Sequence, residues 1–250
     1  MPNWIKNRIL VGKPELMEAI RAKYDNEGQL DLSKIKSMPK ELSIECGSKS
    51  DDGVNLYVTK VDPECGFYGS EKDKISSSEV KKLIKELSKH LFASNAKSLT
   101  EEEVNELREA YKDKFPEVES LGEAKISNIR KFGALNWYEW SIKNWGTKWN
   151  ASNTAWDSKN VTFETAWDPA LPAIIELSKQ NPNIRMAVLY SDEDIGSHVG
   201  YMLLTGGRID YEGTFPDQSR DAYKLAFDLW GCGDEYRYDE KEGTYKRKEE

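Results

Sequence analysis

The spacing of apolar residues predicts alternating strands and helices in the first part of the chain. Residues 5–11 are apolar and β-branched, which is typical of a strand, and the Gly-Lys-Pro that follows ends it. Apolar residues then recur at helical spacing over 16–24, so a helix with one apolar face is expected there. Further strands are expected over 30–35 and 54–61.

A charged segment with strong helix signals follows. Ser76 with Glu79, and Thr100 with Glu103, match capping boxes, in which two side chains satisfy free backbone amides at a helix start. The first of these helices has its apolar positions at i, i+3, i+4, i+7 and i+11: Val80, Leu83, Ile84, Leu87 and Leu91. We interpret 71–130 as a packed helical insertion with solvated charges. A lid or a partner-binding arm is the functional alternative.

The last 120 residues return to alternating elements. The pattern predicts helices over 135–144, 169–179 and 222–229, and strands over 161–166, 186–190, 199–204 and 209–212. Gly206 and Gly207, between the last two strands, are typical of a hairpin turn. The tail over 234–250 is rich in charges of both signs, and we expect it to be frayed or disordered.

This order of elements indicates the α+β class. The simplest topology is a ferredoxin-like antiparallel sheet with helices on one face, built from 1–70 and 131–233 and interrupted by the helical insertion.

Composition narrows the function. The 250 residues carry 36 Lys and Arg against 44 Asp and Glu, a formal net charge of −8, which opposes non-specific binding to nucleic acid but leaves room for a local basic patch. No apolar run approaches the ~18 residues of a membrane span, and no apolar signal region begins the chain. We therefore expect a cytoplasmic protein without membrane contact.

The three cysteines, Cys46, Cys65 and Cys232, form no CxxC pair and indicate neither a zinc site nor a disulfide framework.

Tryptophan is concentrated in one segment. Six of the eight tryptophans lie between residues 137 and 167: Trp137, Trp140, Trp145, Trp149, Trp156 and Trp167. Each indole buries a large area and carries an N–H that needs a partner. One interpretation is an aromatic-walled pocket that stacks a planar ligand. The other is a tryptophan-rich seam of the core, and the sequence favours it for any single tryptophan.

Several motifs carry a family resemblance. In chain order they are Met1-Pro2-Asn3-Trp4 with Asn7-Arg8, Met38-Pro39-x-x-Leu42, Asn136-Trp137-Tyr138-x-Trp140, Asn144-Trp145-Gly146-Thr147-Lys148-Trp149 and Phe163-x-Thr165-Ala166-Trp167-x-Pro169. The chain resembles the YubB-type (Api-like) family, whose members occur on phages and plasmids and are named for a ferredoxin-like domain. The resemblance covers 1–45 and 133–215. It implies this fold and a gene carried on a mobile genetic element of bacteria. It supplies no catalytic residues.

Motifs that carry chemistry are absent. The sequence contains no GxGxxG, GxxxxGK[ST], GxSxG or HExxH. His198 follows Asp192, Glu193 and Asp194, but this spacing matches no metal site, and turns commonly collect aspartate. The other histidine, His90, is read as a surface residue. We assign no metal, cofactor or catalytic residue.

The sequence therefore favours a non-enzymatic phage or plasmid accessory protein that acts by binding, such as a counter-defence factor. It would sequester a nucleotide-type small molecule or occlude a host protein, and self-association is left open. The candidate ligand-binding residues are Trp137, Asn144, Trp145, Lys148, Trp149 and Trp167. Two alternatives remain: an enzyme that uses carboxylates such as Glu139, Asp168, Glu193 or Asp194, and an RNA-binding ferredoxin-like module. The acidic charge counts against the second.

Overall fold

The computed structural model describes residues 2–47 and 118–248. The chain divides into two compact units, one of Met1–Met38 with Ser141–Glu250 and the other of Pro39–Trp140. The helices expected from the two capping boxes and the strand expected over 54–61 lie outside the described residues. None of the described helices is long and apolar enough to cross a membrane.

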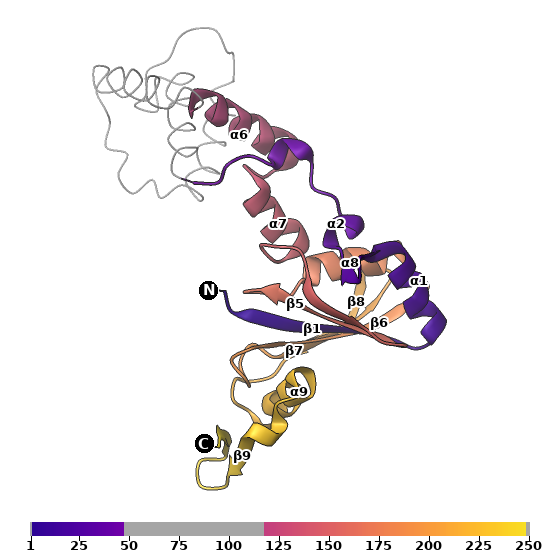
Figure 1. Cartoon of the computed structure of the whole chain (residues 1–250), viewed down its shortest axis with the longest axis vertical. Coiled ribbons are helices and arrows are strands. Elements are labelled where there is room, and N and C mark those ends of the chain that lie inside the picture. The colour runs from indigo at the N-terminus through magenta and orange to yellow at the C-terminus, as the bar shows by residue number, and fades with distance from the viewer. Residues whose placement is uncertain (1, 48–117, 249–250) are drawn as a thin grey trace, which may run out of the picture. The chain divides into compact units, whose positions relative to one another are not determined.

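The larger unit is built on one antiparallel sheet of six strands (Figure 1). Their spatial order is β4-β5-β1-β6-β7-β8. The strands are β1 (Trp4–Val11), β4 (Ser152–Trp156), β5 (Asn160–Ala166), β6 (Arg185–Asp192), β7 (Gly200–Thr205) and β8 (Arg208–Thr214). Two small hairpins accompany the sheet: β2 (Asp25–Asn26) with β3 (Gln29–Leu30), and β9 (Tyr236–Asp239) with β10 (Thr244–Arg247).

The helices of this unit complete a ferredoxin-like core. They are α1 (Pro14–Tyr24), α2 (Leu32–Ile35), α8 (Leu171–Gln180), α9 (Arg220–Trp230) and the short turn η3 (Gly233–Glu235), together with the C-terminal part of α7 (Trp137–Trp145). The sequence β1-α1-β4-β5-α8-β6, with the spatial order β4-β5-β1-β6, is the split βαβ arrangement. The β7–β8 hairpin extends this sheet by two strands. The predicted α+β ferredoxin-like fold is therefore confirmed.

The two faces of the sheet differ. Along β1 the buried residues alternate with half-buried ones, because successive side chains point to opposite faces. Ile5 and Ile9 are fully buried on the face that α1 and α8 cover. Lys6 and Arg8 point to the opposite face, here called the α9 face, because both contact α9 there. Figure 1 shows α9 on the side of the sheet away from α1 and α8. The prediction of helices on one face holds for α1 and α8 and is wrong for α9.

Two other local predictions are wrong. Residues 30–35 are not a strand: Asp31 accepts a hydrogen bond from the Ser33 amide, and this cap begins the short helix α2. The C-terminal tail is not disordered over 236–247, where β9 and β10 pair and their tyrosines pack on α9. The pattern also missed β4, a short edge strand of mostly polar residues. The remaining predicted elements outside the insertion lie within a few residues of their expected positions.

The smaller unit contains the turn η1 (Lys40–Leu42), α6 (Val118–Phe132) and the first residues of α7. The Asn128 amide nitrogen donates to the backbone oxygens of Glu41 and Leu135, which joins η1, α6 and the start of α7. Leu42 and Ile126 are buried between these elements. The boundary between the units falls at 38/39 and 140/141, outside the predicted limits of the insertion.

Candidate ligand-binding site

A glycine ends α7 and turns the chain towards the sheet. Gly146 has φ +84°, a left-handed conformation that favours glycine at the end of a helix. A Cβ at this position would lie 2.5 Å from Pro172 Cδ and 3.0 Å from the Pro169 oxygen, so a side chain has no room. The Gly146 amide still bonds to the α7 carbonyls of Ser141 and Ile142. Gly146 therefore ends α7 and begins the loop that follows it.

Thr147 fixes this loop to the end of β5. Its side chain is fully buried, and its hydroxyl donates to the Ala166 oxygen and accepts from the Ala166 amide, both at 3.1 Å. The next residues, Lys148 and Trp149, are thereby held beside Trp167, which follows β5 directly.

Three tryptophans and one lysine meet at this point. The ring centroids of Trp149 and Trp167 are 5.4 Å apart, and those of Trp4 and Trp149 are 6.4 Å apart. We call Trp4, Trp149 and Trp167 the tryptophan cluster. The Lys148 ammonium lies 4.8 Å from the Trp149 centroid and 5.1 Å from that of Trp167, within the range of cation–π contact. Trp149 and Trp167 each keep 40% of their surface exposed, so the cluster is open to a ligand.

Trp167 has a strained backbone. Its φ is +65°, which is rare for a bulky side chain and costs about 1–3 kcal/mol. Hydrogen bonds around it hold this conformation: its amide donates to the Asn3 oxygen, and the Thr165 hydroxyl donates to the Asp168 oxygen. The fold therefore maintains a costly conformation that keeps the Trp167 ring beside that of Trp149. Strain of this kind is concentrated at functional sites.

The predicted site residues divide into two groups. Lys148, Trp149 and Trp167 come together, whereas Trp145 is only 8% exposed and donates from its indole Nε1 to the Lys36 oxygen at 2.9 Å. Trp145 is thus a core residue rather than part of an exposed surface. Asn144 is half-buried in the last turn of α7, before the loop begins.

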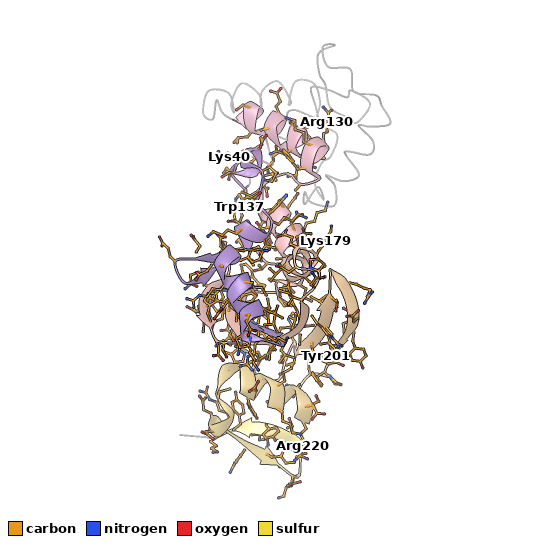
Figure 2. All side chains as sticks on the ribbon, turned by 90° about the vertical axis from the view of Figure 1, so that its right-hand side faces the viewer. Lys40, Arg130, Trp137, Lys179, Tyr201 and Arg220 are labelled. Atoms are coloured by element: carbon orange, nitrogen blue, oxygen red, sulfur yellow. The ribbon has the colours of Figure 1, made fainter. Side chains whose placement is uncertain are left out.

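Trp137 belongs to the smaller unit. Its ring lies edge-on to that of Tyr138, with centroids 5.9 Å apart. Figure 2 labels Trp137 on the ribbon. Sequence reasoning missed Trp4, which joins the cluster because β1 pairs with β5 in a register that sets Trp4 opposite Ala166. The only sequence signal that pointed to Trp4 was its place in the motif at the N-terminus.

Charged residues on the α9 face adjoin the cluster. Lys6 pairs with Glu164 at 3.2 Å, and its ammonium lies 4.2 Å from the centroid of the Trp230 ring. The second carboxylate oxygen of Glu164 accepts from the Asn153 amide nitrogen. The indole Nε1 of Trp230 is buried and has no hydrogen-bond partner. Arg8, the next residue of β1 on this face, pairs with Asp228 of α9.

Two of the carboxylates considered for catalysis have local structural contacts. Glu139 accepts from the Leu135 amide at the start of α7, and Asp194 accepts from the Ser197 hydroxyl. Within the described ranges, no three His, Cys, Asp or Glu side chains are grouped as metal ligands. Burial raises the pKa of the Cys232 thiol, and the nearby Glu235 raises it further, which favours the unreactive protonated form.

The fold and this cluster define an α+β protein with a ferredoxin-like domain and an exposed aromatic surface. Residues 144–246 match a family model described as the ferredoxin-like domain in Api92-like protein. The chain also resembles the crystal structure of the protein api92 from Yersinia pseudotuberculosis, with 12% identity and a TM-score of 0.39 over 86% of this chain and 99% of that one. A likeness at this level says nothing about function. No curated protein matches the chain.

Proposed function

We propose that this protein acts by binding, and that the tryptophan cluster with Lys148 takes a nucleotide-type small molecule. The observation that carries the proposal is the pair of tryptophan rings, each 40% exposed, with one ammonium over both. Exposed apolar patches often mark interaction sites, and here the loop and a strained backbone hold two exposed indole rings together.

The chemistry of the cluster suits a flat ring that carries negative charge. A nucleobase stacks on an indole face, and such stacking contributes about 1–3 kcal/mol per base. The Lys148 ammonium lies where it can bond to a phosphate of the same ligand. On binding, the Lys148 ammonium would give up part of its contact with the two indole rings. In exchange it would form a charge-assisted hydrogen bond to the phosphate.

The loop is also prepared for binding. Gly146 and Thr147 fix its path before a ligand arrives, so little conformational entropy is lost when the ligand binds. A sequestering protein needs affinity rather than turnover, and a rigid aromatic surface supplies affinity without any reacting group.

The biological setting is part of the proposal and rests on the motif resemblance. We propose a non-enzymatic accessory protein of a phage or plasmid in a bacterial cytoplasm, acting as a counter-defence factor that removes a nucleotide-type signal. Occlusion of a host protein by the same surface is the competing outcome.

Tryptophan fluorescence titration with nucleoside 5′-monophosphates tests the proposal. We expect quenching that saturates in the wild-type protein and is lost in Trp149→Ala and strongly weakened in Lys148→Met. Tyr211→Ala is the matched control, because Tyr211 is an exposed aromatic residue (60%) on β8, at the far edge of the sheet. Equal binding by wild type and Trp149→Ala, or no binding of any nucleotide, would refute the proposal.

A further inference from the structure

One aromatic ring and two cations follow one another along the α9 face of β1. Trp4, Lys6 and Arg8 are successive residues on this face, and the strand rise places neighbours about 7 Å apart. Trp4 belongs to the tryptophan cluster, and Lys6 lies over the ring of Trp230. The binding surface therefore continues from Lys148 and the cluster to a second cation beside a second aromatic group.

Lys6, the second cation, has hydrogen-bonding capacity that its contacts within the protein do not use. The Trp230 indole N–H is unpartnered but buried, so it offers no surface to a ligand, and the capacity lies on Lys6. Lys6 has three donors and gives one ion pair to Glu164, whose other oxygen is held by Asn153. The Lys6 side chain remains 20% exposed. A phosphate at this position therefore bonds to the exposed end of Lys6.

We infer that the ligand is a short oligonucleotide with an internucleotide phosphate rather than a mononucleotide. One base stacks on the tryptophan cluster beside Lys148, and the following phosphate bonds to Lys6. Alternating stacking surfaces and cations are the pattern by which proteins hold single-stranded nucleic acid. This inference rests on the proposed function, since it extends the same site.

The surrounding charges limit the ligand to a short one. Glu164 and Asp228 neutralise Lys6 and Arg8, and the protein carries a net charge of −8. A long polyanion gains affinity by neutralising many phosphates along a basic track, and the α9 face offers no such track beyond Arg8 because α9 covers it there. We therefore expect no further gain in affinity once the ligand exceeds about four nucleotides.

A length series of oligonucleotides tests the inference. We expect a 5′-phosphorylated dinucleotide to bind about tenfold more tightly than the corresponding nucleoside 5′-monophosphate, which is the effect of one charge-assisted hydrogen bond. Lys6→Met keeps the apolar stem and should remove this gain while leaving mononucleotide binding unchanged. It should also lower the slope of log affinity against log salt by about 0.7, the value for one phosphate of a single strand.

The control is Lys13→Met, because Lys13 is exposed and follows the opposite end of β1. It should leave both affinities unchanged, and melting curves would confirm that each variant is folded. Mononucleotide binding with no gain for the dinucleotide, or a gain that survives Lys6→Met, would overturn this inference and leave the proposed function standing. Affinity that keeps rising to twenty nucleotides would overturn it too. Failure of every nucleotide to bind would refute both this inference and the proposed function.

Discussion

Replacing Trp145 and Trp149 by alanine, one at a time, separates a core tryptophan from a binding one. The two residues lie four apart on either side of Gly146. Trp145 is 8% exposed and donates to the Lys36 oxygen, whereas Trp149 is 40% exposed and packs against Trp4, Trp167 and the Lys148 ammonium.

The difference in burial sets the expected loss of stability. A buried tryptophan replaced by alanine costs about 3–5 kcal/mol, and the lost hydrogen bond of Trp145 adds about 1 kcal/mol. Trp145→Ala should therefore lower the free energy of unfolding by about 4–6 kcal/mol. Because much less of Trp149 is buried, the same scale gives about 2–3 kcal/mol for Trp149→Ala. At about 2–4 °C per kcal/mol, Trp145→Ala should melt roughly 8–24 °C below wild type and Trp149→Ala roughly 4–12 °C below it.

The assay combines thermal melting by circular dichroism with the nucleotide titration at a temperature where both variants are folded. Trp145→Ala should retain most of its affinity, because its ring faces the core, and Trp149→Ala should lose binding. If Trp149→Ala melts as low as Trp145→Ala and still binds nucleotide, Trp149 is a core residue and the assignment of the site is wrong.

Three further outcomes follow from the local geometry. Gly146→Ala should cost about 2–4 kcal/mol, from the left-handed backbone and the contact with Pro172, and a melting temperature within 2 °C of wild type would contradict this. Burial alone would raise the pKa of Asp31, but the hydrogen bonds that it accepts outweigh burial and lower the pKa below 3.8. The stability that Asp31 contributes is therefore present above pH 3.8 and lost as the pH falls further, and acid melting curves of Asp31→Asn should lack this loss. Burial raises the pKa of Tyr190 above 10.0, so its contribution is lost as the pH rises past that value, and Tyr190→Phe should flatten the alkaline limb of the melting profile.

Local patterns predicted the elements whose periodicity is regular. Residues 5–11, 169–179 and 199–204 formed the expected strand, helix and strand, because a period of two or of 3.6 residues is visible within a short window. The order of these elements then restricted the sheet to a ferredoxin-like arrangement. The pattern failed over 30–35, where one side-chain cap on Asp31 outweighed a run of strand-like residues. It failed again at the hairpin of β9 and β10. There the tyrosines of the two strands contact each other, while the other residues of these strands are polar.

By itself, the sequence determined the fold class and the concentration of tryptophan in one segment. Only the tertiary structure decided which tryptophans are core and which are exposed. Trp145 and Trp149 look alike in sequence, and the left-handed turn between them sends one ring into the core and leaves the other at the surface. Trp4 joined the site through the register of β1 against β5, a long-range pairing that no local pattern encodes.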